Sequence, residues 1–293
     1  MTMLVPECAK ETEALPVKPF IRWAGGKTRL RPRVIPHIPE SFNNYHEPFL
    51  GSGAIFLAID GRINGRAYLA DLNGHLANAW LAVRDHQGAL KTCLAEYKSL
   101  DSKEYYYEVR AQVPSDPIEQ AARFLYLNGT SWNHLWRENS KTGAMNVPWG
   151  NRQFKEFDAD TWRTLKARLR VADVRQEDFR VALTRVEAGD FVYLDPPYLP
   201  VWSDPNEKEP TSKFNKYTAR VFEQKDLEEL ARRCEDFTRR GIRWVMSNRD
   251  TPNVRRLFPF ADVVTFTTHR SLAAQSKRAV EARCSPEAII IGR

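Results

Sequence analysis

The chain has 293 residues, of which 42% are hydrophobic and eight are tryptophan, and its formal net charge is +7. This composition excludes a disordered tail and can fill a sizeable core, in one large domain or in one that carries a smaller insertion. No long apolar run free of charges is present, so we expect a cytoplasmic protein with no membrane span and no membrane partner. The positive charge is compatible with a polyanionic partner but does not identify one.

Residues 1–18 have no clear period and carry several charges, and we expect them to form a loose lead-in. An apolar segment that ends at Glu47 predicts a strand, and a glycine-rich turn and a helical stretch at residues 54–59 come next. Residues 67–70 predict a second strand that ends at Asp71. The order strand, turn, helix, strand indicates a βαβ unit.

Helical periodicity then dominates residues 76–127, with no strand signal among them, and indicates a helical insertion. Residues 128–152 are rich in Asn, Gly, Trp and Arg, and Lys141-Thr142-Gly143 is expected to turn a hairpin between two short extended pieces. A helix is predicted at residues 224–239. Strands that alternate with helices indicate a three-layer α/β sheet. The later strands are predicted at residues 180–183, 191–194, 242–246, 261–267 and 288–291.

Asp195-Pro196-Pro197-Tyr198 directly follows the predicted strand at residues 191–194. This is the carboxyl end of a strand, where open α/β sheets bind ligands. The alternative is a helix capped by Asp195, with Pro196 at its first position. Because Pro197 and Pro200 remove further donors and break a helix within its first turn, we expect a stiff, extended loop instead.

An extended loop of this kind suits the methylation of an amino group. The Asp195 carboxylate and the Pro196 carbonyl can accept both hydrogens of an NH2 group, which positions the amine without deprotonating it. In adenine, fixing these hydrogens directs the nitrogen lone pair at the methyl group of S-adenosyl-L-methionine (AdoMet), and in-line transfer depends on that alignment. Tyr198 is expected to stack on a base flipped out of its helix. The chemistry requires no metal, and the scattered cysteines predict no zinc site.

A glycine-rich turn after the first predicted strand is the cofactor candidate, with the sequence Glu47-Pro48-Phe49-Leu50-Gly51-Ser52-Gly53. Glycines at such a turn let a ligand approach the backbone. Asp71 lies 20 residues after Gly51, the usual spacing for a carboxylate that binds ribose hydroxyls. An Asx turn at residues 71–74 explains Asp71 equally well. The third glycine of the dinucleotide fingerprint is absent, which disfavours NAD and favours a nucleoside cofactor without pyrophosphate.

Trp23-Ala24-Gly25-Gly26-Lys27-Thr28 ends like a P-loop, but Ile21 occupies the position of the first glycine of that motif, which excludes a nucleotide hydrolase. The segment is more informative in combination with the other motifs. Together with the glycine-rich turn, with Ala70-Asp71-Leu72-Asn73 and with Asp195-Pro196-Pro197-Tyr198, it resembles the Dam-type DNA adenine-specific methyltransferases in motif content and order. The resemblance extends from about residue 19 to the C-terminus.

This resemblance implies a fold, a cofactor and a partner. The fold would be a Rossmann-like AdoMet-dependent methyltransferase sheet at residues 19–75 and 160–293, interrupted at residues 76–159 by a helical and hairpin insertion that recognises the target. The cofactor would be AdoMet, and the partner double-stranded DNA. The enzyme would methylate the exocyclic amino nitrogen of a flipped adenine, in the family's GATC target, as a monomer or a weak dimer on DNA.

The resemblance also implies roles for the matched residues. Arg137 is the sharpest of these predictions, because an arginine held bidentate to guanine is the commonest major-groove contact, and its alternative is a solvated charge on the hairpin. The catalytic residues would be Asp195, Pro196, Pro197 and Tyr198. The residues expected to bind the cofactor are Trp23, Ala24, Gly25, Gly26, Lys27, Glu47, Pro48, Phe49, Gly51, Ser52, Gly53, Asp71, Asp178 and Phe179. The residues expected to contact DNA are Asn133, Leu135, Arg137, Asn139 and Pro148.

The sequence departs from the family pattern beside the residues expected to read the bases. Gly129 stands where Arg is common, and His134 stands where Gly is usual, so the target sequence stays open. The loop at residues 199–213 is longer than is typical and is either a lid or a solvated insertion. The alternatives to a DNA methyltransferase are an enzyme that methylates RNA adenine or a protein glutamine amide, and a DNA-binding relative without catalysis.

Overall fold

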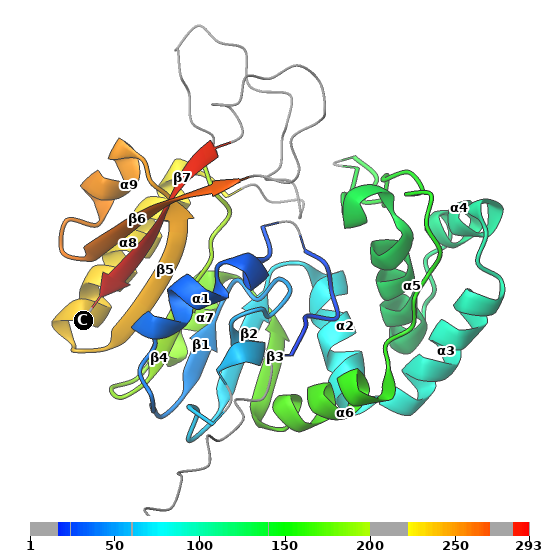
Figure 1. Ribbon diagram of the computed structural model, residues 1–293, viewed down its shortest axis with the longest axis horizontal. Helices are drawn as coiled ribbons and strands as arrows, with labels where there is room; N and C mark the ends of the chain where they lie inside the picture. Colours follow the sequence, from blue (N-terminus) through cyan, green and yellow to red (C-terminus); the bar gives the residue numbers. More distant parts are fainter. Residues whose placement is uncertain are drawn as a thin grey trace, which may run out of the picture.

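The computed structural model describes residues 17–23, 25–59, 61–139, 141–199, 222–269 and 284–292. Four of the segments to which the sequence assigns a role lie outside the described residues: 1–16, Ala24, 200–213 and 270–272. Figure 1 shows two parts joined side by side, a twisted sheet with its covering helices and a group of helices that contains α3, α4 and α5.

The described residues form a seven-stranded sheet in the order β3-β2-β1-β4-β5-β7-β6. All neighbouring strands run parallel, except that β7 is antiparallel to both β5 and β6. The chain reverses its direction across the sheet between β1 and β4, and at such a switch point open α/β sheets bind ligands. The strands are β1 (Tyr45–Glu47), β2 (Ala67–Asp71), β3 (Ala172–Gln176), β4 (Phe191–Leu194), β5 (Arg243–Arg249), β6 (Asp262–His269) and β7 (Cys284–Gly292).

Both faces of the sheet are buried, as the three-layer prediction requires. Successive side chains of a strand point to opposite faces, and β4 follows this period. Phe191 and Tyr193 belong to one hydrophobic cluster, and Val192 and Leu194 belong to another. The first cluster continues into the helices of the insertion, and the second contains side chains of α7, α8 and α9. The helices are α1 (Arg31–Val34), α2 (Gly74–Asp85), α3 (Gln87–Ser99), α4 (Lys103–Ala111), α5 (Pro117–Thr130), α6 (Ala159–Arg168), α7 (Phe179–Ala182), α8 (Gln224–Arg239) and α9 (Pro252–Leu257).

The structure corrects the prediction for the segment before β4. Residues 180–183 were expected to form a strand, but α7 occupies Phe179–Ala182, because the Asp178 carboxylate accepts a hydrogen bond from the backbone N–H of Arg180 and caps the helix. The strand of this region is β3, at Ala172–Gln176. It lies at the edge of the sheet and exposes Arg175 and Gln176, so it lacks the apolar run of a central strand.

The helical insertion and its hairpin are confirmed. Helices α2 to α5 occupy the region in which helical periodicity dominates the sequence. The backbone N–H of Asn139 donates to the carbonyl of Ala144 at 2.9 Å, and that of Asn146 donates to the carbonyl of Arg137 at 3.0 Å, which closes the hairpin around Lys141 to Gly143. No helix in the described part of the chain is both long enough and apolar enough to cross a membrane.

Candidate active site

Asp195 follows β4 at the switch point between β1 and β4. Residues 195–199 form no helix, so the extended loop is confirmed and the helix-cap alternative is wrong. The Asp195 Oδ1 atom lies 2.7 Å from Lys27 Nζ and accepts a hydrogen bond from Ser247 Oγ at 3.4 Å. Among the described residues, no hydrogen-bond donor pairs with Asp195 Oδ2 or with the Pro196 carbonyl. Two neighbouring acceptors are therefore left for a ligand.

Lys27 fixes one side of this loop. Its ammonium donates to the carbonyl of Gly25 at 2.7 Å as well as to Asp195, and it lies 4.9 Å from the centre of the Tyr198 ring. Burial raises the pKa of Asp195, and the adjacent Lys27 ammonium opposes that shift. The half-buried Asp195 carboxylate thus has the Lys27 ammonium beside Oδ1, and its Oδ2 atom can still accept a hydrogen bond.

Two residues that sequence reasoning missed complete the loop's surroundings. The Tyr198 hydroxyl donates to Glu287 Oε2 at 3.2 Å, and Glu287 reaches this edge because β7 runs antiparallel and pairs it with Arg249 at the end of β5. Ser247 lies 2.6 Å from the hydroxyl of Tyr193. Since Ser247 gives its only hydrogen to Asp195, Tyr193 must donate to Ser247. No sequence motif indicates Glu287 or Ser247, because strand pairing alone brings each of them to the site.

The glycine-rich turn after β1 packs too tightly for side chains. Gly51 and Gly53 have φ values of +48° and +61°, which favour glycine. A Cβ on Gly53 would lie 2.6 Å from the ring of Trp80, and one on Gly51 would lie 3.0 Å from the ring of Trp23. The helix predicted at residues 54–59 is only a 3₁₀ turn at Phe56–Ala58. The turn therefore presents bare backbone at the switch point.

Asp71 connects the glycine-rich turn to the end of β2. Its Oδ2 atom accepts a hydrogen bond from the N–H of Gly51 at 3.0 Å, and its Oδ1 atom accepts one from the N–H of Asn73 at 2.9 Å. The Asx turn at residues 71–74 is therefore present, and Asp71 also contacts the glycine-rich turn. Each oxygen of the Asp71 carboxylate keeps a lone pair for a ligand. Burial raises the pKa of Asp71 to about 6, and the hydrogen bonds from Asn73 and Gly51 oppose that rise.

Glu47 ends β1 as a buried carboxyl group that accepts a hydrogen bond from the Tyr45 hydroxyl at 2.9 Å. Burial raises the pKa of Glu47 to about 8; the hydrogen bond from Tyr45 opposes this rise, and the nearby charge of Asp195 adds to it. Pro48 and Ser52 are buried beside it, and Phe49 packs against Phe179 with ring centres 5.4 Å apart. The site thus brings three carboxyl groups with raised pKa values to one edge of the sheet, those of Glu47, Asp71 and Asp195.

The raised pKa of Glu47 predicts a stability that falls as the pH rises. The folded protein keeps this proton up to a pH of about 8, whereas the unfolded chain loses it near the ordinary value of 4.5. The contribution is complete below pH 4.5 and is lost as the pH approaches 8, at about 1.4 kcal/mol per pH unit at most. We expect Glu47→Gln, which mimics the protonated acid, to flatten the free energy of unfolding between pH 6 and pH 8, as measured by chemical denaturation without cofactor.

Asp71→Asn is the matched control for this prediction. Its carboxyl group loses its proton near pH 6, so the variant should change the stability profile below that pH and follow the unmodified protein above it. Parallel profiles of the unmodified protein and Glu47→Gln from pH 6 to pH 8 would contradict a protonated Glu47.

Asp178 and Phe179, predicted to contact the adenine of the cofactor, lie at the start of α7. Asp178 caps this helix and pairs with Arg180, with Oδ1 and the guanidinium nitrogen 3.1 Å apart. The Phe179 ring is buried between Phe49 and Phe222. Asp178 therefore stabilises the start of α7, and the Phe179 ring packs against Phe49 of the glycine-rich turn.

The residues expected to contact DNA have different surroundings on the hairpin. Arg137 is exposed, and its side chain makes no hydrogen bond or ion pair with any residue the structure describes. Leu135 is buried in the main core, and the Asn139 side chain accepts from the N–H of Lys141 at 2.9 Å inside the hairpin turn. Asn133 has a φ of +53°, and Pro148 is exposed.

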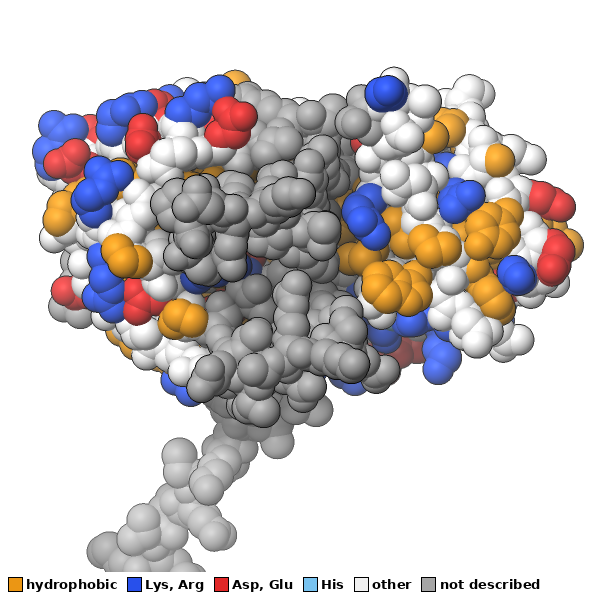
Figure 2. Space-filling view, turned by 90° about the horizontal axis from the view of Figure 1, so that it is seen from above, with side chains coloured by type: hydrophobic (Ala, Val, Ile, Leu, Met, Phe, Trp, Pro, Cys, Tyr) orange, Lys and Arg blue, Asp and Glu red, His pale blue; other side chains and the backbone are white. Residues whose placement is uncertain are grey.

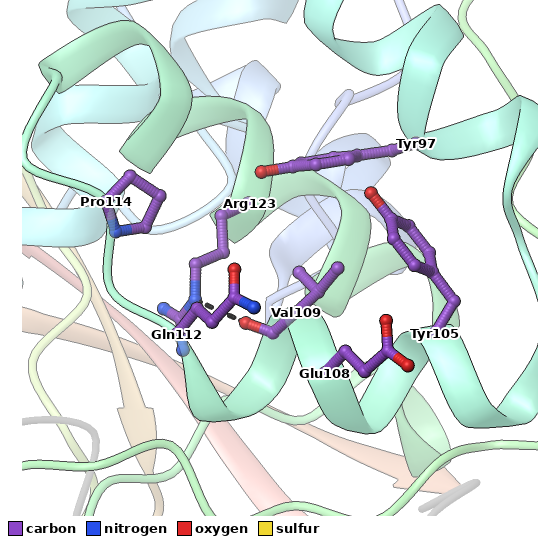
Figure 3. A pocket seen from close by; sticks show the side chains of 7 residues that line it. All are labelled: Tyr97, Tyr105, Glu108, Val109, Gln112, Pro114 and Arg123. Atoms are coloured by element: carbon purple, nitrogen blue, oxygen red, sulfur yellow. Dashed lines mark hydrogen bonds between the residues drawn. The ribbon is translucent and has the colours of Figure 1, made fainter.

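A small cavity lies apart from this edge, between α3, α4 and α5 (Figure 3). Its volume is about 60 Å³, far below that of a nucleoside pocket. Arg123 in its wall donates to the carbonyls of Val109 and Arg110 at 2.8 and 2.7 Å and so caps the end of α4. The cavity is a feature of helix packing and holds none of the predicted site residues.

Comparison with known proteins identifies the family that shares this arrangement. A sequence description of the D12 class N6 adenine-specific DNA methyltransferases matches residues 23–272. The chain belongs to this family. The Dam-type resemblance, the Rossmann-like methyltransferase sheet and the assignment as an adenine-specific DNA methyltransferase are thereby confirmed.

Several relatives of this methyltransferase match along most of their length. The DNA adenine methylase of Haemophilus influenzae is 30% identical over 289 residues, which cover 96% of each chain. The type II methyltransferase M.MjaIII of Methanocaldococcus jannaschii is 32% identical over 251 residues, covering 79% of this chain and 84% of the relative. The type II methyltransferase M1.LlaDCHI of Lactococcus lactis is 29% identical over 269 residues, covering 89% and 91%.

Proposed function

We propose that this methyltransferase moves the methyl group of AdoMet to the exocyclic amino nitrogen of an adenine flipped out of double-stranded DNA. The observation that carries the proposal is the pair of open acceptors at the end of β4. Asp195 is held on its Oδ1 side by Lys27 and Ser247, whereas its Oδ2 atom and the Pro196 carbonyl have no donor among the described residues. Two acceptors side by side match the two hydrogens of an amino group.

The glycine-rich turn and its neighbours fit a cationic nucleoside cofactor. The rings of Trp23 and Trp80 pack against Gly51 and Gly53 and leave no room for a Cβ there, so the turn stays free of side chains at these positions. Asp71 offers a lone pair on each oxygen to ribose hydroxyls. When bound, AdoMet supplies an electrophilic methyl group on a sulfonium ion. The pKa of Asp71 is about 6, so at neutral pH this carboxylate places a negative charge beside the turn, which favours a cation.

The chain's own residues would position the amine for the transfer. Asp195 and Pro196 accept the amine hydrogens and thereby orient the nitrogen lone pair. Tyr198, whose hydroxyl is held by Glu287, offers its ring to the flipped base, and one stacked base contributes about 1 to 3 kcal/mol. Lys27 opposes the rise that burial causes in the pKa of Asp195, and it orients the carboxylate. Pro197 stiffens the loop so that these groups keep their geometry.

We propose that residues 76–159 recognise the target and that Arg137 reads a base in it, with GATC as the first candidate. The side chain of Arg137 is exposed and pairs with no residue in the described part of the chain, which supports this role. Arg137→Ala should weaken the preference for one base pair by about 1 to 3 kcal/mol. Competition binding with duplexes altered at single positions measures this preference. Lys141→Ala, which removes a charge from the tip of the same hairpin, is the control, and equal discrimination by Arg137→Ala and the unmodified protein would remove Arg137 from base reading.

Incubation with labelled AdoMet tests the proposed function. Duplex DNA, RNA of the same sequence and a glutamine-containing peptide would be offered in parallel, and the modified adenines would be mapped by sequencing. We expect label in DNA alone, on adenines within one short sequence. Label in RNA or in the peptide, or no label in DNA, would contradict the proposal.

A further inference from the structure

Two arginine side chains from distant parts of the chain meet at one histidine. The NH1 atom of Arg22 donates to His134 Nε2 at 2.6 Å, and the NH1 atom of Arg152 donates to the same nitrogen. Arg22 is exposed, and His134 and Arg152 are half-buried, so solvent reaches all three side chains. We call these residues the basic cluster. The basic cluster joins the segment next to Trp23, which packs against the glycine-rich turn, to the hairpin that contains Arg137.

Asn128, at the end of α5, holds the basic cluster in place. Its Oδ1 atom accepts from the N–H of Arg22 at 3.1 Å, and its Nδ2 atom donates to the carbonyls of Arg22 at 2.8 Å and of His134 at 3.0 Å. The side chain of Asn128 is buried, so these bonds are shielded from water. The side-chain amide of Asn128 thus holds the backbone at Arg22 and at His134, which lie more than 100 positions apart in the chain.

The contacts of the imidazole define its tautomer. His134 Nδ1 lies 3.0 Å from the carbonyl of Asn128 and must donate to it, which leaves Nε2 as an acceptor for both guanidinium groups. Burial and the two nearby arginines lower the pKa of His134, so the ring stays neutral at neutral pH. The two cations therefore share a neutral acceptor.

The basic cluster differs from the arginine pairs on α8 and α9, because no acid lies within it. Among the described residues, no carboxylate pairs with Arg22 or Arg152. On α8 and α9 each exposed pair of arginines lies beside an acid, as in the ion pairs that Arg232, Arg239 and Arg255 form. Figure 2 shows basic and acidic side chains mixed on one part of the molecule, and on the other part basic and hydrophobic side chains near the middle with acidic ones at the edge.

We propose that the basic cluster binds one backbone phosphate of the DNA substrate, an inference that rests on the proposed function. A phosphate offers several strong acceptors, and guanidinium groups recognise it through paired N–H donors. The neutral histidine aligns both arginines before DNA arrives, which reduces the entropy lost on binding. Because a phosphate contact carries no sequence information, the basic cluster would anchor DNA of any sequence beside the hairpin.

The test measures DNA affinity as a function of salt for Arg22→Ala, Arg152→Ala and the double variant. The probes are a short duplex containing the mapped target and one of equal composition without it. Each single variant should bind both duplexes about tenfold more weakly, since a hydrogen bond to a charged group is lost. The double variant should lower the slope of log affinity against log salt by about 0.9, the share of one phosphate. Thermal melting checks that each variant is folded.

Arg163→Ala is the matched control, because it removes the same charge from an exposed position on α6. It should leave the slope unchanged. An unchanged slope in the double variant would overturn the phosphate site, and so would a loss of affinity confined to the target duplex, which would indicate base reading. The proposed function is judged separately, by methylation with the unmodified protein. If that protein methylates DNA while the slope of the double variant is unchanged, only the basic cluster fails.

Discussion

Asp195→Ala should reduce the rate of methyl transfer by about 10³-fold and leave the affinity for AdoMet nearly unchanged. The variant loses the acceptor at Oδ2, and removal of one preorganised polar group at a reacting centre typically costs 10² to 10³ in rate. It also leaves Lys27 without its carboxylate at 2.7 Å, which removes a second constraint on the loop. Single-turnover transfer to DNA and calorimetric titration with AdoMet measure the two quantities separately.

Asp173→Ala is the matched control for this experiment. Asp173 also pairs with a basic side chain at 2.7 Å, that of Arg175, but it lies on β3 at the edge of the sheet. This variant should transfer methyl groups at the normal rate. An Asp195→Ala protein that turned over like the control would refute the role of the Asp195 carboxylate in holding the amine.

Asp71→Ala should have the opposite signature, with AdoMet bound about 100-fold more weakly and near-normal transfer at saturating cofactor. The substitution removes the proposed acceptor for the ribose and releases the N–H groups of Gly51 and Asn73 that the carboxylate binds. Hydrogen bonds to a charged group contribute about 1.5 to 3 kcal/mol each, so the loss of one or two of them accounts for this factor.

Calorimetry and the dependence of the transfer rate on AdoMet concentration measure this effect. Asp71→Asn is the control, because its remaining oxygen still accepts one backbone N–H, and it should fall between the two extremes. If AdoMet bound Asp71→Ala as tightly as the unmodified protein, Asp71 would have only the structural role of the Asx turn.

The sequence predicts those parts of the site that are contiguous in the chain. Asp195 and Pro196 follow a strand of four buried residues, and the glycines of the turn follow another strand, so a local pattern reports both positions. Ser247 and Glu287 lie on strands that reach the site only through the pairing of β4 with β5 and of β5 with β7. Nothing in the residues around them indicates that pairing.

Two expectations for the hairpin show the same limit. The resemblance implies that Leu135 and Asn139 contact DNA, but a motif does not report that Leu135 is packed in the core and that the Asn139 side chain closes the turn. The sequence does not predict β3, because its exposed polar residues interrupt the alternation of apolar and polar residues that is typical of a strand. Sequence patterns predict a chemistry for the site, whereas tertiary packing decides which side chains are exposed.

The Asn128 side chain has a consequence for the engineering of target choice. It holds both carbonyl and N–H of Arg22, and the next residue, Trp23, packs against Gly51 in the cofactor turn. We therefore expect a displacement of the hairpin to move Trp23 and the glycine-rich turn, and by thermodynamic reciprocity we expect a cofactor bound at the proposed site to restrain the hairpin. Attempts to retarget the enzyme by redesigning residues around His134 should accordingly be screened for cofactor affinity as well as for sequence preference.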